Sequence, residues 1–399
     1  MITDTHKSCK IASFFLAFCL ATISLTKTSS VHANIVDVLR ILVLGAFLVT
    51  LCIDVYLTFI YRVMSKKLLI VTFITLGFYI WGTMLSSLYG GIEYFLESKE
   101  IIFVIIMSML FSWSAGAIGG EIKYDEIDSK IRKYIPIYAV LCLLLIFIFG
   151  GIRFSFPPSF IFGDGNFLSY SQGLSKIFGI TSLVCLISYI KSNNSKVINL
   201  SLSIFFLFLS FLGGARGDFA IALLIYSILI FLYNKKLSLI ILAIVAMTYS
   251  SINLTSLSDD FYIINRFMQL DTSNLGMRDV LASDAFELIG NNESCLIFGC
   301  GFNAFQYTYS YRFGLYPHNV LIELIVTYGL FLSSLFIIIF MYGINKMRIS
   351  GNLVNSFFVI ALYLFLIGLK SGTIIDLLLV GFFINIAGNA FVESENSLN

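Results

Sequence analysis

Long apolar runs, separated by short polar segments, repeat from one end of the chain to the other. A helix needs roughly 20 apolar residues to cross the hydrocarbon core of a bilayer. Runs of this size predict about 12 membrane-spanning helices and an all-α polytopic integral membrane protein. We place the spans at 11–26, 35–59, 68–88, 101–118, 134–150, 167–190, 198–212, 217–233, 237–255, 319–342, 353–369 and 372–391.

The polar segments differ in charge, and this difference predicts how the spans are oriented. With the N-terminus inside, the inner segments collect most of the basic residues, whereas the short outer loops hold few. Because cytoplasmic loops are enriched in Lys and Arg, we expect both termini in the cytoplasm. The inner groups are Lys7 and Lys10; Arg62, Lys66 and Lys67; Lys123, Lys130, Arg132 and Lys133; Lys191 and Lys196; Lys235 and Lys236; Lys346 and Arg348.

The first apolar run has a second interpretation. Lys7 and Lys10 precede it, and "VHA" at 31–33 followed by Asn34 resembles the cleavage site of a secretory signal. We favour a retained helix, because multispan inner-membrane proteins usually insert through their first helix. Cleavage would leave the remaining topology unchanged.

Composition narrows the class further. Of the 399 residues, 58% are hydrophobic and 12% are charged, and the mean hydropathy is +0.93. No polar stretch is long enough to fold as a separate soluble domain, so we expect residues 1–399 to form a single integral membrane domain. The net charge of +2 is spread between the spans rather than gathered on one basic face, and it does not indicate a nucleic acid partner.

The cysteines fall into two groups. Cys295 and Cys300 share one polar loop, where a disulfide or two free thiols are both open, depending on the compartment. No CxxC or HExxH pattern occurs in the sequence, so we expect no metal ion and no other cofactor. The others lie in or beside apolar runs, where a thiol behaves as a small hydrophobe: Cys9, Cys19, Cys52, Cys142 and Cys185.

The outer face has one long loop, residues 256–318, and we look for function there because long ordered loops usually have one. Within it, "MRDVLASDAFELIG" at 277–290 has apolar residues at helical spacing and ends in Gly290. We expect a helix that lies along the membrane surface.

Arginines mark the outer face. "FLGGARGDF" at 211–219 places Arg216 at the outer end of a span, where it either snorkels to lipid headgroups or binds a group that the flanking glycines admit. In the long loop, Arg266, Arg278 and Arg312 could grip phosphate through two hydrogen bonds each, or pair with acids such as Asp284.

Two further polar groups lie near the outer face. Asp37 and Arg40 are three residues apart on the second span; they either pair with each other, or Arg40 contacts substrate. His318 begins the tenth span, over the positive end of a helix dipole, where it either caps the helix or acts as a proton acceptor. Asn319 and Glu323, four residues apart, share a face of this helix and are further candidates for substrate binding.

The order of four motifs resembles the O-antigen ligase and polymerase superfamily. The motifs are "GGARG" between two spans, then "MRDVLASDAFELI", "IFGCGFNAF" and "YPHNVLIELIVTYG" in one outer loop, all within 211–330. The most specific element is His318 and Asn319 followed by Gly329. Leu332 departs from the ligase pattern, which has a small or aromatic residue there, and so favours a polymerase.

The resemblance implies a chemistry for these residues. Members are similar to inverting, metal-independent glycosyltransferases of the GT-C type, which act at the periplasmic face of the bacterial inner membrane on glycans carried by undecaprenyl pyrophosphate. Carried over to this chain, it implies that Arg216 and Arg278 hold the pyrophosphate and that His318 lies near the attacked sugar. Whether His318 is a general base or a positioning group is left open.

We therefore expect a polymerase that joins lipid-linked repeat units into O-antigen or a related surface polysaccharide. The implied partners are undecaprenyl-pyrophosphate-linked glycans, the lipid bilayer, and a chain-length regulator and flippase of the same pathway. One alternative is the ligase, which transfers the chain to lipid A-core. Another is a non-enzymatic transporter or flippase, which predicts charges near mid-membrane; Lys176 and Asp376 are the charges well inside spans away from Arg40, and most polar groups instead lie on one face.

Overall fold

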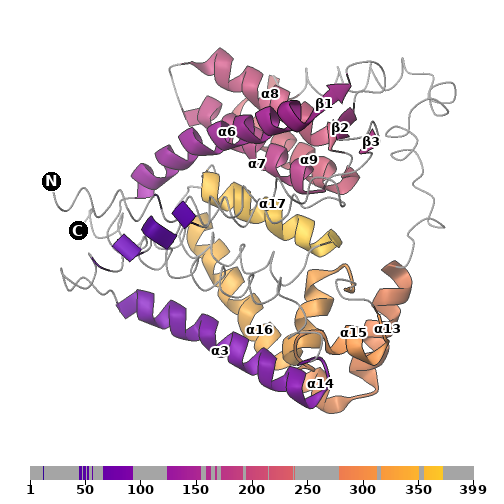
Figure 1. Ribbon diagram of the computed structural model, residues 1–399. Coiled ribbons are helices and arrows are strands. Elements are labelled where there is room, and N and C mark those ends of the chain that lie inside the picture. The colour runs from indigo at the N-terminus through magenta and orange to yellow at the C-terminus, as the bar shows by residue number, and fades with distance from the viewer. Residues whose placement is uncertain are drawn as a thin grey trace.

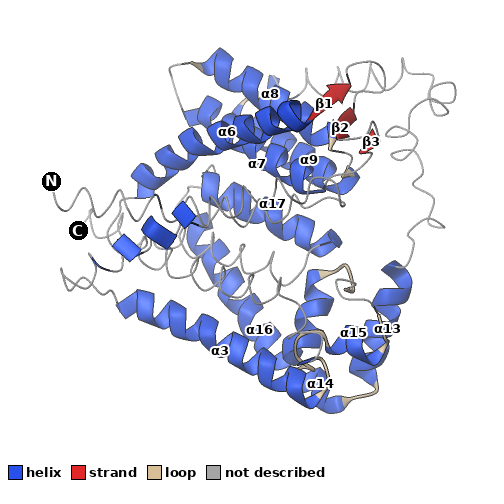
Figure 2. Cartoon of the chain, in the orientation of Figure 1, coloured by secondary structure: helices blue, strands red, loops and turns tan. Residues whose placement is uncertain are grey.

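The chain is described here from a computed structural model, which is predominantly helical (Figure 2). The predicted spans at 101–118 and 372–391 lie wholly outside the described residues, which include only residue 12 of 11–26, residue 238 of 237–255 and eight scattered residues of 35–59. The described residues are 12, 45–46, 48–50, 52–53, 56, 66–92, 124–153, 159–162, 167–168, 172–191, 195–213, 215–236, 238, 278–311, 316–349 and 355–371.

Within these residues, seven helices overlap predicted spans and confirm the helical class. Two apolar stretches, Gly173–Lys191 and Val320–Ile338, are long enough to cross a membrane, and three shorter apolar helices accompany them. The seven helices are α3 (Lys66–Leu88), α6 (Tyr124–Phe149), α7 (Gln172–Lys191), α8 (Lys196–Leu212), α9 (Arg216–Tyr233), α16 (Val320–Ile349) and α17 (Ser356–Ser371).

A small antiparallel sheet follows α6 and was not predicted. Its strands are β1 (Gly150–Arg153), β2 (Ser159–Phe162) and β3 (Phe167–Leu168), in the order β1-β2-β3. The predicted start of a span at 167 is therefore wrong, because β3 occupies that position and α7 begins at Gln172.

Helices α7 and α8 pack closely through two reciprocal serine pairs. Ser182 and Ser203 each donate a hydroxyl hydrogen bond to the other's carbonyl oxygen, both at 2.8 Å. Seven residues along each helix, Ser175 and Ser210 do the same, at 2.9 and 2.8 Å. Small hydroxyl residues of this kind let apolar helices approach one another, and the bonds fix the register of α7 against α8.

Helix α17 lies between α9 and α16 (Figure 1) and is held at both ends by buried aspartates. At its start, Asp128 of α6 accepts from the backbone N–H of Ser356 at 3.3 Å and pairs with Lys191 of α7 at 3.0 Å. At its end, Lys370 pairs with Asp218 of α9 at 3.4 Å. The position of α17 along its axis is therefore fixed relative to α6, α7 and α9.

The described part of the long loop forms three helices, α13 (Arg278–Gly290), α14 (Glu293–Phe298) and α15 (Ala304–Thr308). The helix predicted at 277–290 is confirmed, within one residue. Its buried residues, Leu281, Ala285 and Ile289, pack with Val326 of α16. The described part of the loop is therefore folded onto α16.

Candidate functional site

The three residues that the resemblance implies as catalytic all stand at the N-terminal ends of helices. Arg216 is the first residue of α9 and Arg278 the first of α13, both placed here by their main chain alone. His318 lies two residues before Val320, the start of α16. Unpaired N–H groups and the helix dipole make such ends electropositive. The remaining candidate arginines, Arg40, Arg266 and Arg312, lie outside the described residues.

The turn before Arg216 is tied to α7 by Ser175. The Ser175 hydroxyl accepts from the buried backbone N–H of Ala215 at 3.3 Å while donating to the carbonyl oxygen of Ser210. Gly213 allows this approach, because a Cβ at that position would overlap the Ser175 hydroxyl and backbone. The main chain that presents Arg216 is therefore held against the start of α7.

Asp218, two residues after Arg216, joins α9 to α17. Its side chain is fully buried and accepts a charged hydrogen bond from Lys370, which is 32% exposed. The stem of Lys370 crosses Gly217, where an added Cβ would overlap its Cδ, Cε and Nζ. Because Gly217 has no side chain, Lys370 of α17 can pass beside the first turn of α9 and reach Asp218.

His318 adopts an uncommon backbone conformation. Its φ of 54° lies in the left-handed region, which non-glycine residues other than Asn, Asp and His rarely occupy. Its ring contacts that of Tyr316, with the two ring centroids 4.4 Å apart, and the side chain is half-buried. The imidazole therefore lies at the N-terminal end of α16, before the first helical residue, and contacts Tyr316.

Asn319 caps α16. Its side-chain oxygen accepts from the backbone N–H groups of Leu321 and Ile322, at 2.9 and 3.4 Å. Its carbonyl oxygen accepts from the N–H of Glu323 at 3.0 Å, the first bond of the helical ladder. These hydrogen bonds give Asn319 a structural role as the N-terminal cap of α16. Glu323 lies one turn further into the helix, and its side chain is half-buried.

The last turn of α17 also contacts the start of α16. Gly368 lies against Val320, with 3.4 Å between the Val320 Cγ1 and the position of an added Cβ. Leu369 belongs to the same apolar cluster as Val320 and Leu324. The next residue, Lys370, pairs with Asp218 in the first turn of α9. Residues 368–370 therefore connect the start of α9 to the start of α16.

Helix α13 is placed beside the same end of α16. Leu281, three residues after Arg278, packs in one apolar cluster with Ile322, four residues after His318. The starts of α9 and α16, close to Arg216 and His318, therefore both lie against the last turn of α17, while α13, which begins at Arg278, packs against α16.

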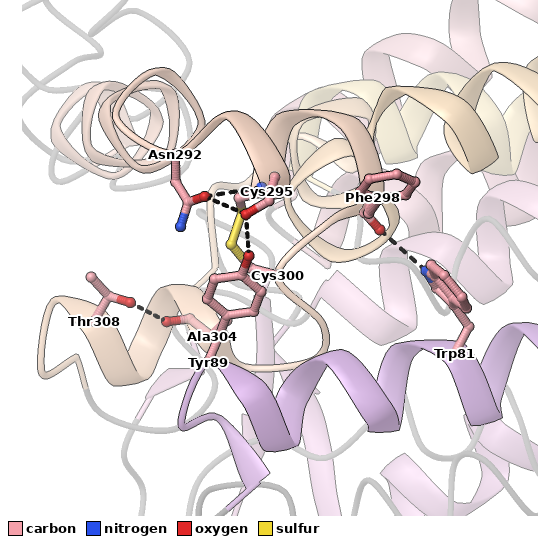
Figure 3. Close-up of a disulfide and its surroundings, with 9 residues drawn as sticks. Trp81, Tyr89, Asn292, Cys295, Phe298, Cys300, Ala304 and Thr308 are labelled. Atoms are coloured by element: carbon pink, nitrogen blue, oxygen red, sulfur yellow. Dashed lines mark hydrogen bonds between the residues drawn. A yellow bond between two sulfur atoms is a disulfide. The ribbon is translucent and has the colours of Figure 1, made fainter.

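Cys295 and Cys300 are joined by a disulfide, which decides the alternative that the sequence left open. Figure 3 shows Trp81 and Tyr89 reaching from the end of α3 toward this segment. The Trp81 indole N–H donates to the carbonyl oxygen of Phe298 at 3.1 Å, and the Tyr89 hydroxyl lies 2.6 Å from that of Ser294. The disulfide segment is therefore docked on α3.

The same segment is hydrogen-bonded to a break in α16. The helix is interrupted at Gly329, where φ is 71° and ψ is 175°. The carbonyl oxygens of Val326 and Thr327 accept instead from the backbone N–H groups of Cys300 and Gly301, at 2.7 and 3.0 Å. Gly329 and the "FGCGF" motif thus have a structural explanation, since they let two backbones pair at close range.

Aromatic side chains cover the junction of α13 and α15. Tyr309 and Tyr311 stack with ring centroids 6.0 Å apart, and both contact Phe305. The Tyr311 hydroxyl donates to the carboxylate of Asp284. This hydrogen bond, followed by burial and the Asp284 charge, raises the pKa of Tyr311; burial and then the charges of Glu287 and Asp284 raise that of Tyr309.

Sequence reasoning did not select Ser175, Asp218 or Lys370. Asp218 could have been selected from the sequence, because it stands at the start of an apolar run and a buried carboxylate requires a partner. Among the described residues, no group of three or more His, Cys, Asp and Glu side chains is arranged to hold a metal ion. The described candidate residues Arg216, Arg278 and His318 stand at or just before helix N-termini, which are electropositive.

Comparisons with models of known protein families, with curated proteins and with solved structures found no match to this chain.

Proposed function

We propose that this protein is a glycosyltransferase of the bacterial inner membrane that polymerises undecaprenyl-pyrophosphate-linked repeat units into O-antigen or a related surface polysaccharide. In this proposal the chain crosses the membrane about 12 times, both termini are cytoplasmic, and the transfer takes place at the periplasmic face in a GT-C-like fold. The residue motifs within 211–330 are the origin of the proposal.

One structural observation supports it above the others. The starts of α9 and α16, close to Arg216 and His318, lie against the last turn of α17, and α13, which begins at Arg278, packs against α16. Helix N-termini attract anions, and guanidinium groups bind phosphate through two parallel hydrogen bonds. A pyrophosphate group carries the charge that such an arrangement would stabilise.

The proposed reaction breaks one bond and forms one. A hydroxyl oxygen of the acceptor glycan attacks the anomeric carbon of the donor, while the bond from that carbon to the pyrophosphate oxygen breaks with its electron pair. Arg216 and Arg278 stabilise the negative charge that grows on the leaving pyrophosphate. His318 either accepts the proton of the attacking hydroxyl or orients that hydroxyl.

The disulfide supports the proposed orientation. Disulfides persist in the periplasm and are rare in the cytoplasm, so the bond between Cys295 and Cys300 favours a periplasmic position for this loop. In Figure 1, α3 and α6 run in the same general direction, α3 toward the loop helices and α6 toward the sheet. This is the direction that the charge distribution predicts for both helices.

Deleting the gene in its host and displaying the lipopolysaccharide on a gel tests the proposal. A polymerase predicts that the deletion strain makes core carrying a single repeat unit, and that the gene on a plasmid restores the ladder. Bare core with accumulating lipid-linked chains would indicate the ligase instead. An intact ladder would exclude both enzymes and leave transport.

Arg278→Lys tests the proposed role of the first residue of α13. This change keeps the charge but removes the planar fork, so we expect most activity to be lost while protein levels hold. Arg132→Lys is the matched control, because Arg132 pairs with Asp128 at the start of α17, remote from the candidate residues. Equal activity of the two variants would remove Arg278 from the pyrophosphate site.

A further inference from the structure

The ion pair between Asp218 and Lys370 has features that a simple packing contact does not need. Asp218 is fully buried, and Lys370 reaches it across Gly217, at a position where any side chain would collide. The lysine therefore lies beside the residue that follows Arg216. A buried carboxylate left without this cation would be costly, so the pair holds α17 against the first turn of α9.

The residues just before Lys370 make a second connection. Gly368 and Leu369 contact Val320 or share its cluster, and Val320 is the fully buried first residue of α16, two residues after His318. A displacement of Lys370 would therefore shift the start of α9 relative to the start of α16.

The geometry points to Lys370 and Asp218 as positioning residues that set the distance between Arg216 and His318. This inference rests on the proposed function and adds two residues to it. Productive transfer requires the leaving pyrophosphate and the attacking hydroxyl to lie on opposite sides of one carbon, and errors of about 1 Å in such an arrangement can slow a reaction on the order of 100-fold. Neither residue needs to contact the substrate to have this effect.

The other end of α17 supplies a matched control. Lys191 pairs with Asp128 at 3.0 Å, and the exposures of the two pairs are similar: 27% and 1% for Lys191 and Asp128, against 32% and 0% for Lys370 and Asp218. Asp128 accepts from the N–H of Ser356 at the start of α17, away from Arg216 and His318, and it also pairs with Arg132 at 3.1 Å. Lys191→Met therefore reports the loss of a lysine beside the buried aspartate at the other end of α17.

We would measure repeat-unit addition by the purified full-length protein in lipid nanodiscs, using the host's undecaprenyl-pyrophosphate-linked repeat unit as substrate. Lys370→Met is expected to lower kcat roughly tenfold or more with little change in KM, because the arginine contact strengthens in the transition state. Lys370→Arg restores the cation and is expected to recover most of kcat. Lys191→Met should keep kcat near the wild-type value at a similar melting temperature.

Gly217→Ala provides a second variant in which no charge is lost. Alanine favours a helix more than glycine does, so the variant is expected to fold, while its methyl group displaces the Lys370 side chain. We expect its kcat to fall as in Lys370→Met.

The possible failures are distinct. If wild-type protein adds no repeat units, the proposed function fails and the positioning role fails with it. If wild-type protein is active but Lys370→Met matches Lys191→Met in kcat, or if Lys370→Arg is no better than Lys370→Met, only the positioning role is overturned.

Discussion

The backbone N–H of Cys300 donates to the carbonyl oxygen of Val326 at 2.7 Å, and this bond joins the loop after α14 to a helix that breaks three residues further on. Inside an unbroken helix the Val326 carbonyl would accept from Leu330. Because Gly329 interrupts the ladder, the carbonyl is free to accept from the loop instead. Loop docking and helix breaking are thus two parts of one arrangement.

Gly329→Ala should destabilise the protein. At a φ of 71° a Cβ is strained, and it would also overlap the Ile297 carbonyl and the backbone nitrogen of Gly299. We expect the free energy of unfolding to fall by more than about 1 kcal/mol, because alanine replaces glycine at a positive φ that it cannot easily adopt. Unfolding of the purified protein in detergent, followed by tryptophan fluorescence, measures the change.

Gly290→Ala is the control for this experiment. Gly290 ends α13 with no atom within 4 Å of an added Cβ, so alanine there meets open space. We expect unchanged or slightly raised stability. Equal losses in the two variants would show that the conformation at Gly329 is not the cause.

The disulfide makes a prediction about both chemistry and location. After denaturation without reductant, Cys295 and Cys300 should resist a maleimide, and reduction should add two labels per chain. Replacing both with serine should abolish that gain and cost about 2 kcal/mol of stability, since the closed loop is short. Labelling is read as a mass shift on a denaturing gel.

Cys52→Ser is the matched control for the disulfide, because Cys52 is an exposed free thiol. It should leave the gain of two labels intact. A host strain that lacks periplasmic thiol oxidation should yield both thiols reduced. Full labelling of the wild-type protein before reduction would contradict both the bond and the periplasmic position of the loop.

Asn319 can be tested as a cap separately from any contact with substrate. Asn319→Ala removes the acceptor for the N–H groups of Leu321 and Ile322, and we expect a loss of about 0.5–2 kcal/mol in unfolding free energy. Asn319→Ser restores a capping oxygen and should recover most of that stability. Loss of sugar transfer in a stable Asn319→Ser protein would show that the amide contacts substrate as well.

The sequence predicted local helices well where apolar runs end at charged residues or turns. The spans predicted at 198–212 and 217–233 match α8 and α9 within two residues, and the helix predicted at 277–290 matches α13 within one. In each case the signal lies within the element itself. The sheet at β1 to β3 was missed because its strands are only two to four residues long, too short to show alternation.

The candidate site was predictable only in part, because its connections join distant segments. The start of a helix beside His318 followed from the apolar run that begins there, and the structure places α16 at that point. The pairing of Asp218 with Lys370 spans 152 residues, and nothing local to either residue specifies it. Gly329 was selected as part of a motif, but the break depends on backbone donors from Cys300 and Gly301.

Alkaline pH should destabilise the loop through Tyr311. Its neutral hydroxyl donates to the Asp284 carboxylate, whereas a phenolate would be repelled by it, so the folded-state pKa is raised above the ordinary value of 10.0. Above about pH 10 the unfolded chain therefore releases its tyrosine proton before the folded chain does, and the stability supplied by this group falls as pH rises. Below that pH the contribution is fully present.

Tyr311→Phe separates this effect from other alkaline titrations. The variant loses the hydrogen bond to Asp284 and should be less stable than wild type at neutral pH, but its stability should decline less steeply above pH 10. Asp284→Asn removes the charge that raises the pKa, so tyrosinate absorbance should appear at lower pH than in the wild type. Some slope should persist in Tyr311→Phe, because burial and the charges of Glu287 and Asp284 also raise the pKa of Tyr309. Parallel unfolding curves for wild type and Tyr311→Phe across this pH range would mean that the Tyr311 hydrogen bond does not form in solution.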